Sequence, residues 1–137
     1  MNFHKILLIL GIGSVFTAIS CKRETKDEKF WQDFQQFTQK ECPKFVDPCT
    51  RLDSAFYDID SRTICYYYTV QDALDIDSIY TDELKDAFRN NIQKGLKNSI
   101  PMKQYKDEGV TFRYTYRSIT TGKTHLELTF TPEDYGK

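Results

Sequence analysis

Few residues of this chain have the types and spacing that catalysis needs. Imidazole-dependent chemistry would have to use His125, because the other histidine, His4, lies in an apolar N-terminal segment. Alternation along the chain places His125 on the polar side of a strand beside Glu127, so we interpret it as a solvated strand residue. The sequence contains no Gly-x-Ser-x-Gly turn, glycine-rich phosphate loop or Cys-x-x-Cys pair.

Paired carboxylates are the remaining route to catalysis, because Asp and Glu can act as general acid and base without histidine. Turn formation and helix N-terminal charge are the favoured explanation for the same side chains. A calcium loop with its central glycine and terminal glutamate is absent, so we expect no metal and no cofactor. The candidates are Asp58 with Asp60, the run Asp72, Asp75 and Asp77, and Glu133 with Asp134.

The overall composition is that of a folded domain. Of the 137 residues, 39% are hydrophobic and 15% aromatic, with only 6 Gly and 4 Pro, which excludes a disordered or collagen-like chain. The 19 basic and 20 acidic residues give a formal net charge of -1. A chain without a positive field is not expected to bind nucleic acid.

Hydrophobic periodicity predicts two amphipathic helices and two β-hairpins within one domain, residues 30–135. Phe30, Trp31, Phe34 and Phe37 recur at helical spacing. The second helix repeats an apolar residue every four positions and has a capping residue at Thr81 or Asp82. The helices are expected over 29–41 and from about 82 to 99, and the strands over 51–57, 63–70, 110–117 and 125–130.

These elements predict an α+β fold in the order α-β-β-α-β-β. The economical arrangement is a four-stranded antiparallel sheet with two helices on one face. Because the halves 29–70 and 81–131 have the same element order, an αββ duplication is a further hypothesis.

The sheet face away from the helices is the candidate interaction site. Tyrosine and arginine are enriched at protein interfaces, since each combines contact area with directed hydrogen bonds. Ordinary cross-strand ion pairs on a solvated sheet are the alternative interpretation. The predicted interaction residues are Asp53, Tyr57, Tyr67, Arg113, Arg117 and Glu127, with Cys65 and His125 on the same face.

Three cysteines lie within the predicted domain. Cys42 and Cys49 are close in sequence and enclose two prolines, so they are the candidate disulfide pair. A pairing that involves Cys65, or no bridge at all, is the alternative. The Cys-x6-Cys spacing fits no zinc site.

The first twenty residues have the pattern of a secretory signal peptide. The apolar run Ile6–Ile19 is about 14 residues long, whereas a membrane-spanning helix needs about 20. Ala18-Ile19-Ser20-Cys21 resembles the lipobox of bacterial lipoproteins, although Ala18 stands where leucine is commonest. The resemblance implies cleavage before Cys21, acylation (palmitate) of its thiol and attachment to the membrane without spanning it. A plain signal peptide is the alternative.

Residues 21–29 are expected to form a charged, solvated tether between the lipid and the domain. Within it, Lys26-Asp27-Glu28 resembles the short Lys-acidic-acidic signals that send lipoproteins to the cell surface in Bacteroidetes-type bacteria. The resemblance implies a location in the cell envelope at the outer membrane, on the cell surface. The alternatives are a domain that faces the periplasm and a generic charged linker without a targeting role.

The sequence therefore favours a membrane-anchored, non-enzymatic binding domain whose partner is a protein or another envelope component. An immunity or inhibitor protein belongs to the same class. The alternatives are a small carboxylate-dependent envelope hydrolase and a structural accessory subunit of an envelope complex.

Overall fold

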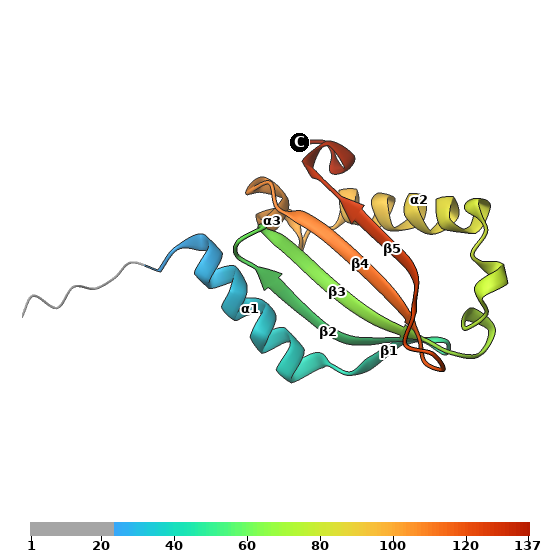
Figure 1. The fold of residues 1–137 in the computed structure, drawn as a ribbon. Coiled ribbons are helices and arrows are strands. Elements are labelled where there is room, and N and C mark those ends of the chain that lie inside the picture. The colour runs from blue at the N-terminus through green and yellow to red at the C-terminus, as the bar shows by residue number, and fades with distance from the viewer. Residues whose placement is uncertain (1–23) are drawn as a thin grey trace, which may run out of the picture.

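The computed structural model describes residues 24–137; the predicted signal peptide and the lipobox with Cys21 lie outside the described residues. The elements are α1 (Lys26–Glu41), β1 (Lys44–Asp47), β2 (Thr50–Asp58), β3 (Thr63–Val70), α2 (Asp82–Asn98), α3 (Lys103–Asp107), β4 (Thr111–Ser118) and β5 (Thr124–Phe130). Short 3-10 turns cover Asp72–Leu74, Asp77–Ile79 and Pro132–Tyr135. Figure 1 shows the strands running diagonally across the domain, with α1 beside β2 and α2 on the side of β5.

The fold is α+β, as expected, but the sheet is mixed and has five strands in the order β1-β2-β3-β4-β5. The predicted sheet was antiparallel throughout, and this is wrong at its centre, where β3 and β4 run parallel. Residues 71–110 separate these two strands and contain α2 and α3, which provide the long crossover that a parallel pair needs. The fifth strand, β1, is a short edge strand that pairs antiparallel with β2.

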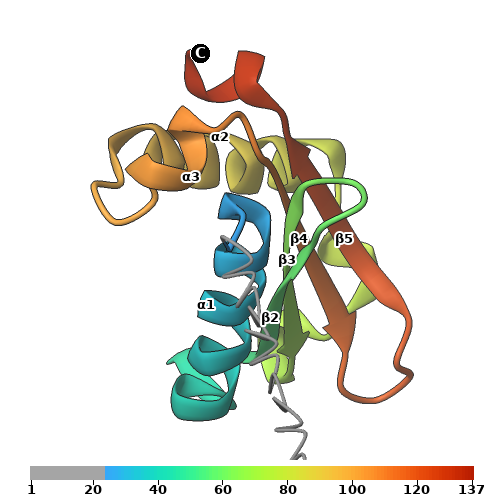
Figure 2. The ribbon, with the colours of Figure 1, turned by 90° about the vertical axis from the view of Figure 1, so that its left-hand side faces the viewer.

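Both long helices cover the same face of the sheet, as predicted. Phe34 of α1 packs edge-on against Tyr66 of β3, with ring centroids 6.1 Å apart. Phe88 of α2 packs in the same way on Tyr116 of β4, at 5.7 Å. Figure 2 shows α1 and α3 on one side of the sheet.

The parallel central pair argues against the αββ duplication. Since β4 runs parallel to β3, it runs opposite to β2, the strand to which a duplication would match it. In both hairpins, however, the second strand lies on the same side of the first, since β3 follows β2 and β5 follows β4 in the sheet order. The helix of each half also covers the same face of the sheet. Only a mirror operation relates two such units, so the halves do not superpose strand for strand.

Helix α1 begins at Lys26, inside the segment 21–29 that was expected to be a tether. Thr25 and Glu28 form a capping box, in which each side chain accepts a hydrogen bond from the other residue's backbone N–H. The Asp27 carboxylate accepts a hydrogen bond from the Tyr57 hydroxyl at 2.6 Å and pairs with Arg62. The Lys26-Asp27-Glu28 stretch is therefore the first turn of a packed helix rather than a solvated linker.

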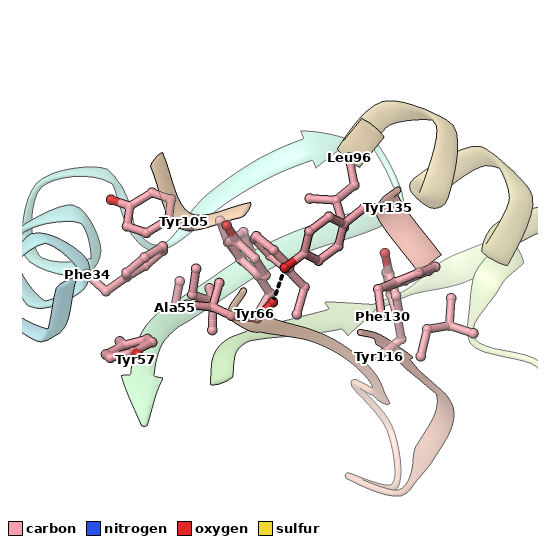
Figure 3. Packing of buried hydrophobic residues seen from close by; sticks show 14 of the residues in the cluster. Phe34, Ala55, Tyr57, Tyr66, Leu96, Tyr105, Tyr116, Phe130 and Tyr135 are labelled. Carbon is pink, nitrogen blue, oxygen red and sulfur yellow. Dashed lines mark hydrogen bonds between the residues drawn. The ribbon is translucent and has the colours of Figure 1, made fainter. Parts of the chain in front are cut away.

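The hydrophobic core lies between the helices and the sheet and is unusually rich in tyrosine. Tyr66 stacks on Tyr114 at 5.0 Å and Tyr68 on Tyr116 at 4.7 Å, across the parallel pair of strands. Figure 3 shows Phe34 and Tyr105 at one end of this cluster and Tyr116 with Phe130 at the other. Stacked rings of this kind bury a large apolar area between the helices and the sheet.

One helix side chain closes the exposed edge of β2 beyond the end of β1. The hydroxyl of Thr38 on α1 donates a hydrogen bond to the carbonyl of Ala55 and accepts one from its N–H at 2.9 Å. An unpaired strand edge otherwise offers its backbone groups to other chains. Thr38 thus fastens α1 to the sheet and covers this edge.

Candidate functional site

A bulge in β2 decides which of its side chains face outward. The pairing of β2 with β3 shifts between Leu52 and Ser54, which reverses the alternation that follows. Tyr57 therefore points into the core and is 1% exposed, so its prediction as an interaction residue is wrong. Phe56, which the unbroken alternation placed inside, is 41% exposed on the other face. The shift is a backbone irregularity that the residue pattern of β2 does not predict.

We call the helix-free side of the sheet the open face. Three of its side chains form a continuous stack: Phe56 lies parallel to Tyr67 with ring centroids 5.7 Å apart, and the Arg117 guanidinium lies 4.9 Å from the Tyr67 centroid. An exposed phenylalanine on a half-buried tyrosine, with a cation on the tyrosine ring, offers both apolar contact and hydrogen-bond donors. The open face comprises Phe56, Cys65, Tyr67, Arg113, Thr115, Arg117 and Glu127.

The carboxylates of this region are engaged within the domain. Asp53, at the bulge, accepts hydrogen bonds from Arg51 at 2.6 Å and from the Thr69 hydroxyl. Glu127 accepts a hydrogen bond from the Thr115 hydroxyl at 3.3 Å. Both residues lie on the helix-free side, as predicted.

Unlike Asp53, the two arginines of the open face, Arg113 and Arg117, have no charged partner within the described part of the domain. Neither Arg113 nor Arg117 forms an ion pair with any residue of the described chain, 24–137. The Nε of Arg113 is buried and has no hydrogen-bond partner there. A buried donor without an acceptor is costly, so the hydrogen bonding of Arg113 within the domain is incomplete. The cross-strand ion pairs of the alternative interpretation therefore do not explain Arg113 and Arg117.

The cysteines are free thiols in the described part of the chain, so the predicted Cys42–Cys49 disulfide is not supported. The reason is that β1 separates them: a four-residue strand advances the chain by roughly 13 Å, whereas bridged Cα atoms lie within about 7 Å. Cys65 is buried under the open face opposite Arg113, and burial raises the pKa of its thiol. A protonated, covered thiol is a poor nucleophile.

His125 is not the solvated residue that the alternation predicted. A register shift beside it turns the ring toward the 71–80 segment, where it stacks on Tyr80 at 4.7 Å. Its Nε2 lies 2.8 Å from Oδ1 of Asp75 and its Nδ1 lies 2.8 Å from Oδ1 of Asp77. The His125 side chain is only 4% exposed. We define His125, Asp75, Asp77 and Tyr80 as the histidine clasp, which fastens the 71–80 segment to β5.

The other candidate carboxylates occupy turns and caps. Asp58 accepts hydrogen bonds from Ser61 and from the Asp60 N–H in the β2–β3 turn. Asp134 caps the last 3-10 turn through the Thr131 N–H at 2.8 Å and pairs with Arg89 at 3.1 Å. Within residues 24–137, no three His, Cys, Asp or Glu side chains are arranged to hold a metal ion. No helix over this range has the length and apolar character to cross a membrane.

Comparison with known proteins assigns the chain to a family. It belongs to the DUF8479 family, a domain of unknown function whose profile matches residues 25–127. No curated protein matches it in sequence.

Three solved structures of bacterial proteins share the fold. A secreted protein of Pseudomonas aeruginosa superposes with a TM-score of 0.65 at 10% identity, covering 82% of this chain and 97% of that one. EpsS, a pilotin of the Vibrio vulnificus type 2 secretion system, gives 0.59 at 9% identity, covering 81% and 92%. AspS, a type II secretion system pilotin of Vibrio cholerae, gives 0.56 at 14% identity, covering 79% and 90%. At these identities the likeness concerns the fold alone.

Proposed function

We propose that this chain is a lipid-anchored accessory protein of the bacterial cell envelope that binds another protein through the open face and catalyses no reaction. The observation that carries the proposal is the Phe56–Tyr67–Arg117 stack, exposed at Phe56 and Arg117, beside Arg113, whose buried Nε has no acceptor in the described chain. Aromatic side chains and arginines of this kind dominate the binding energy of protein interfaces.

The proposed anchor is an acyl group on Cys21, supported by the lipobox-like Ala18-Ile19-Ser20-Cys21. Attachment through several acyl chains holds a domain far more firmly than a single chain does. Replacing Cys21→Ala should release the protein from membranes into the soluble fraction. If that variant stayed in the membrane pellet after its partners were stripped away, the lipid anchor would be wrong.

The proposed role is that of an accessory subunit of an envelope secretion assembly. It is supported by the fold that the chain shares with two pilotins of type II secretion systems. An inhibitor of a soluble hydrolase has no comparable support. A carboxylate-dependent hydrolase is also disfavoured, because Asp58, Asp75 and Asp134 are each bound by neighbouring groups in turns and caps.

Site-specific cross-linking in native membranes tests the open face as the binding site. A benzoylphenylalanine at position 56 replaces a ring that is 41% exposed on the open face. The same photoreactive residue at Lys40, an exposed position on α1, serves as the control. We expect one specific protein adduct from position 56 and none from position 40. Adducts of equal yield and identity from both positions, or none from position 56, would contradict the proposal.

A further inference from the structure

A hollow of about 590 Å³ lies where the C-terminal end of α2, the helix α3 and the last residues of the chain meet. Four lysines line it, Lys97, Lys103, Lys106 and Lys137, and we call this site the lysine hollow. Asp107 is the one carboxylate side chain in its described lining. The site is separate from the open face, because α3 packs on the helix-covered side of the sheet through Tyr105.

The charge of the lysine hollow is mostly unneutralised. Lys103 pairs with Asp107 at 2.6 Å, and Lys106 donates to the carbonyls of Leu96 and Lys97 at the end of α2. Lys97 and Lys137 form no ion pair with the described residues. The hydrogen bond from Lys103, and then the charges of Lys103, Lys137 and Lys106, lower the pKa of Asp107. The hollow is thus a concave cationic surface with room for anionic groups.

The lysine hollow also lies near the beginning of α1. Lys26, in the first turn of α1, pairs with Glu108 directly after α3. Phe30 and Tyr105 are in edge-to-face contact at 4.7 Å, so α1 begins beside α3. Only four residues lead from Cys21 to the helix cap Thr25, and they span at most about 14 Å. An acyl anchor on Cys21 would hold this end of the domain close to the bilayer.

We infer that the lysine hollow binds the anionic headgroups of the bilayer that carries the acyl anchor. Lysines near an anionic surface attract it over about a Debye length, roughly 8–10 Å, which a short linker makes reachable. Phosphate headgroups would enter between Lys97, Lys103 and Lys137, while Lys106 continues to cap α2. The open face points to the other side of the sheet and stays free for a protein partner.

The inference rests on the proposed acylation of Cys21 and is independent of the proposed protein partner. Its consequence is a fixed orientation of the domain on the membrane. An acyl anchor alone would leave the domain free to rotate about its linker, and contact through the hollow removes that freedom.

Hydrogen exchange of the full acylated protein in vesicles tests the inference. The vesicles are phosphatidylethanolamine with either about one third phosphatidylglycerol or the same share of phosphatidylcholine. We expect peptides covering residues 97–107 to exchange about threefold more slowly on the anionic vesicles. The Lys97→Gln/Lys103→Gln/Lys137→Gln variant should lose this difference, and the control Lys40→Gln/Lys85→Gln/Lys123→Gln, with the same charge change elsewhere, should keep it.

Equal exchange on both vesicles, or a difference that survives the triple replacement in the hollow, would overturn the inference. Loss of the difference in the control as well would show a general effect of charge and would overturn it too. Intact mass reports acylation in the same samples, so an absent acyl group is recognised as failure of the anchor. The partner proposal is read separately by cross-linking from position 56.

Discussion

His125 and Asp75 lie fifty residues apart in sequence, yet the His125 Nε2 is 2.8 Å from Oδ1 of Asp75, and both side chains are almost fully buried. Asp75 also accepts hydrogen bonds from the N–H and the hydroxyl of Thr120 in the β4–β5 turn. The contact therefore joins three segments: the loop before α2, the β4–β5 turn and the start of β5. A histidine that first attracts attention as a catalytic candidate is instead a structural connection.

The clasp predicts a local rather than a global effect of mutation. His125→Ala removes both contacts with carboxylates and the stacking on Tyr80, so the amides of residues 71–80 should exchange faster with solvent. Amides of β3, two strands away from β5 in the sheet, should be little affected. Asp72→Asn, a change of an exposed carboxylate in the same segment, is the control. Unchanged exchange in 71–80 would show that the clasp does not hold the segment.

The ionisation of Asp75 predicts a specific loss of stability in acid. Side-chain hydrogen bonds from Ser118, His125 and Thr120 hold the pKa of Asp75 well below its usual 3.8. A carboxyl group whose pKa is lower in the folded state stabilises the fold above its unfolded pKa, and this contribution is lost as the pH falls through the folded pKa. The free energy of unfolding, measured in urea, should therefore fall more between pH 5 and about pH 2 for the wild type than for Asp75→Asn. An equal fall in the free energy of unfolding for the two proteins over this pH range would contradict the prediction.

The neighbouring residues Phe56 and Tyr57 should respond in opposite ways to truncation. Tyr57→Ala removes a fully buried ring and should destabilise the domain by about 3–5 kcal/mol. Phe56→Ala removes an exposed ring, so the free energy of unfolding should change by less than about 0.5 kcal/mol while partner binding weakens. Chemical denaturation beside a pull-down measures both. A Tyr57→Ala variant as stable as the wild type would contradict the burial of this ring in the core.

The Thr38 hydroxyl should contribute to stability through the edge of β2. Thr38→Val keeps the shape of the side chain but leaves the Ala55 N–H and carbonyl without their partner. We expect a loss of about 2 kcal/mol in the free energy of unfolding. Thr38→Ser retains the hydroxyl and should lose much less. Equal losses in the two variants would assign the effect to packing instead.

Periodicity predicted the local elements of this chain well. Phe30 and Phe34 mark α1 and are buried in the structure, and Thr81 caps α2 as one of its two predicted capping residues. The paired hairpins also lie where the alternation of apolar residues places them. These features depend on contacts within a few residues, which a sequence pattern records directly.

The features that were missed depend on contacts between distant segments. The parallel pairing of β3 with β4 follows from how the 71–110 crossover returns, and either direction is compatible with the strand patterns. The bulges that bury Tyr57 and turn His125 inward each displace the alternation by one residue. Tyr67, Arg113 and Arg117 therefore lie on the predicted face of the sheet, whereas Tyr57, which follows the bulge in β2, does not.

The most direct test of the central claim is quantitative affinity capture of the tagged full-length protein from its own membranes. The wild type is compared with Arg113→Glu/Arg117→Glu and with the control Lys40→Glu/Lys85→Glu, which makes the same charge change on the helical side. We predict that the wild type and the control capture the same envelope protein, and that the captured amount is at least tenfold lower with the arginine variant. Retention of that protein by the arginine variant would contradict binding through the open face.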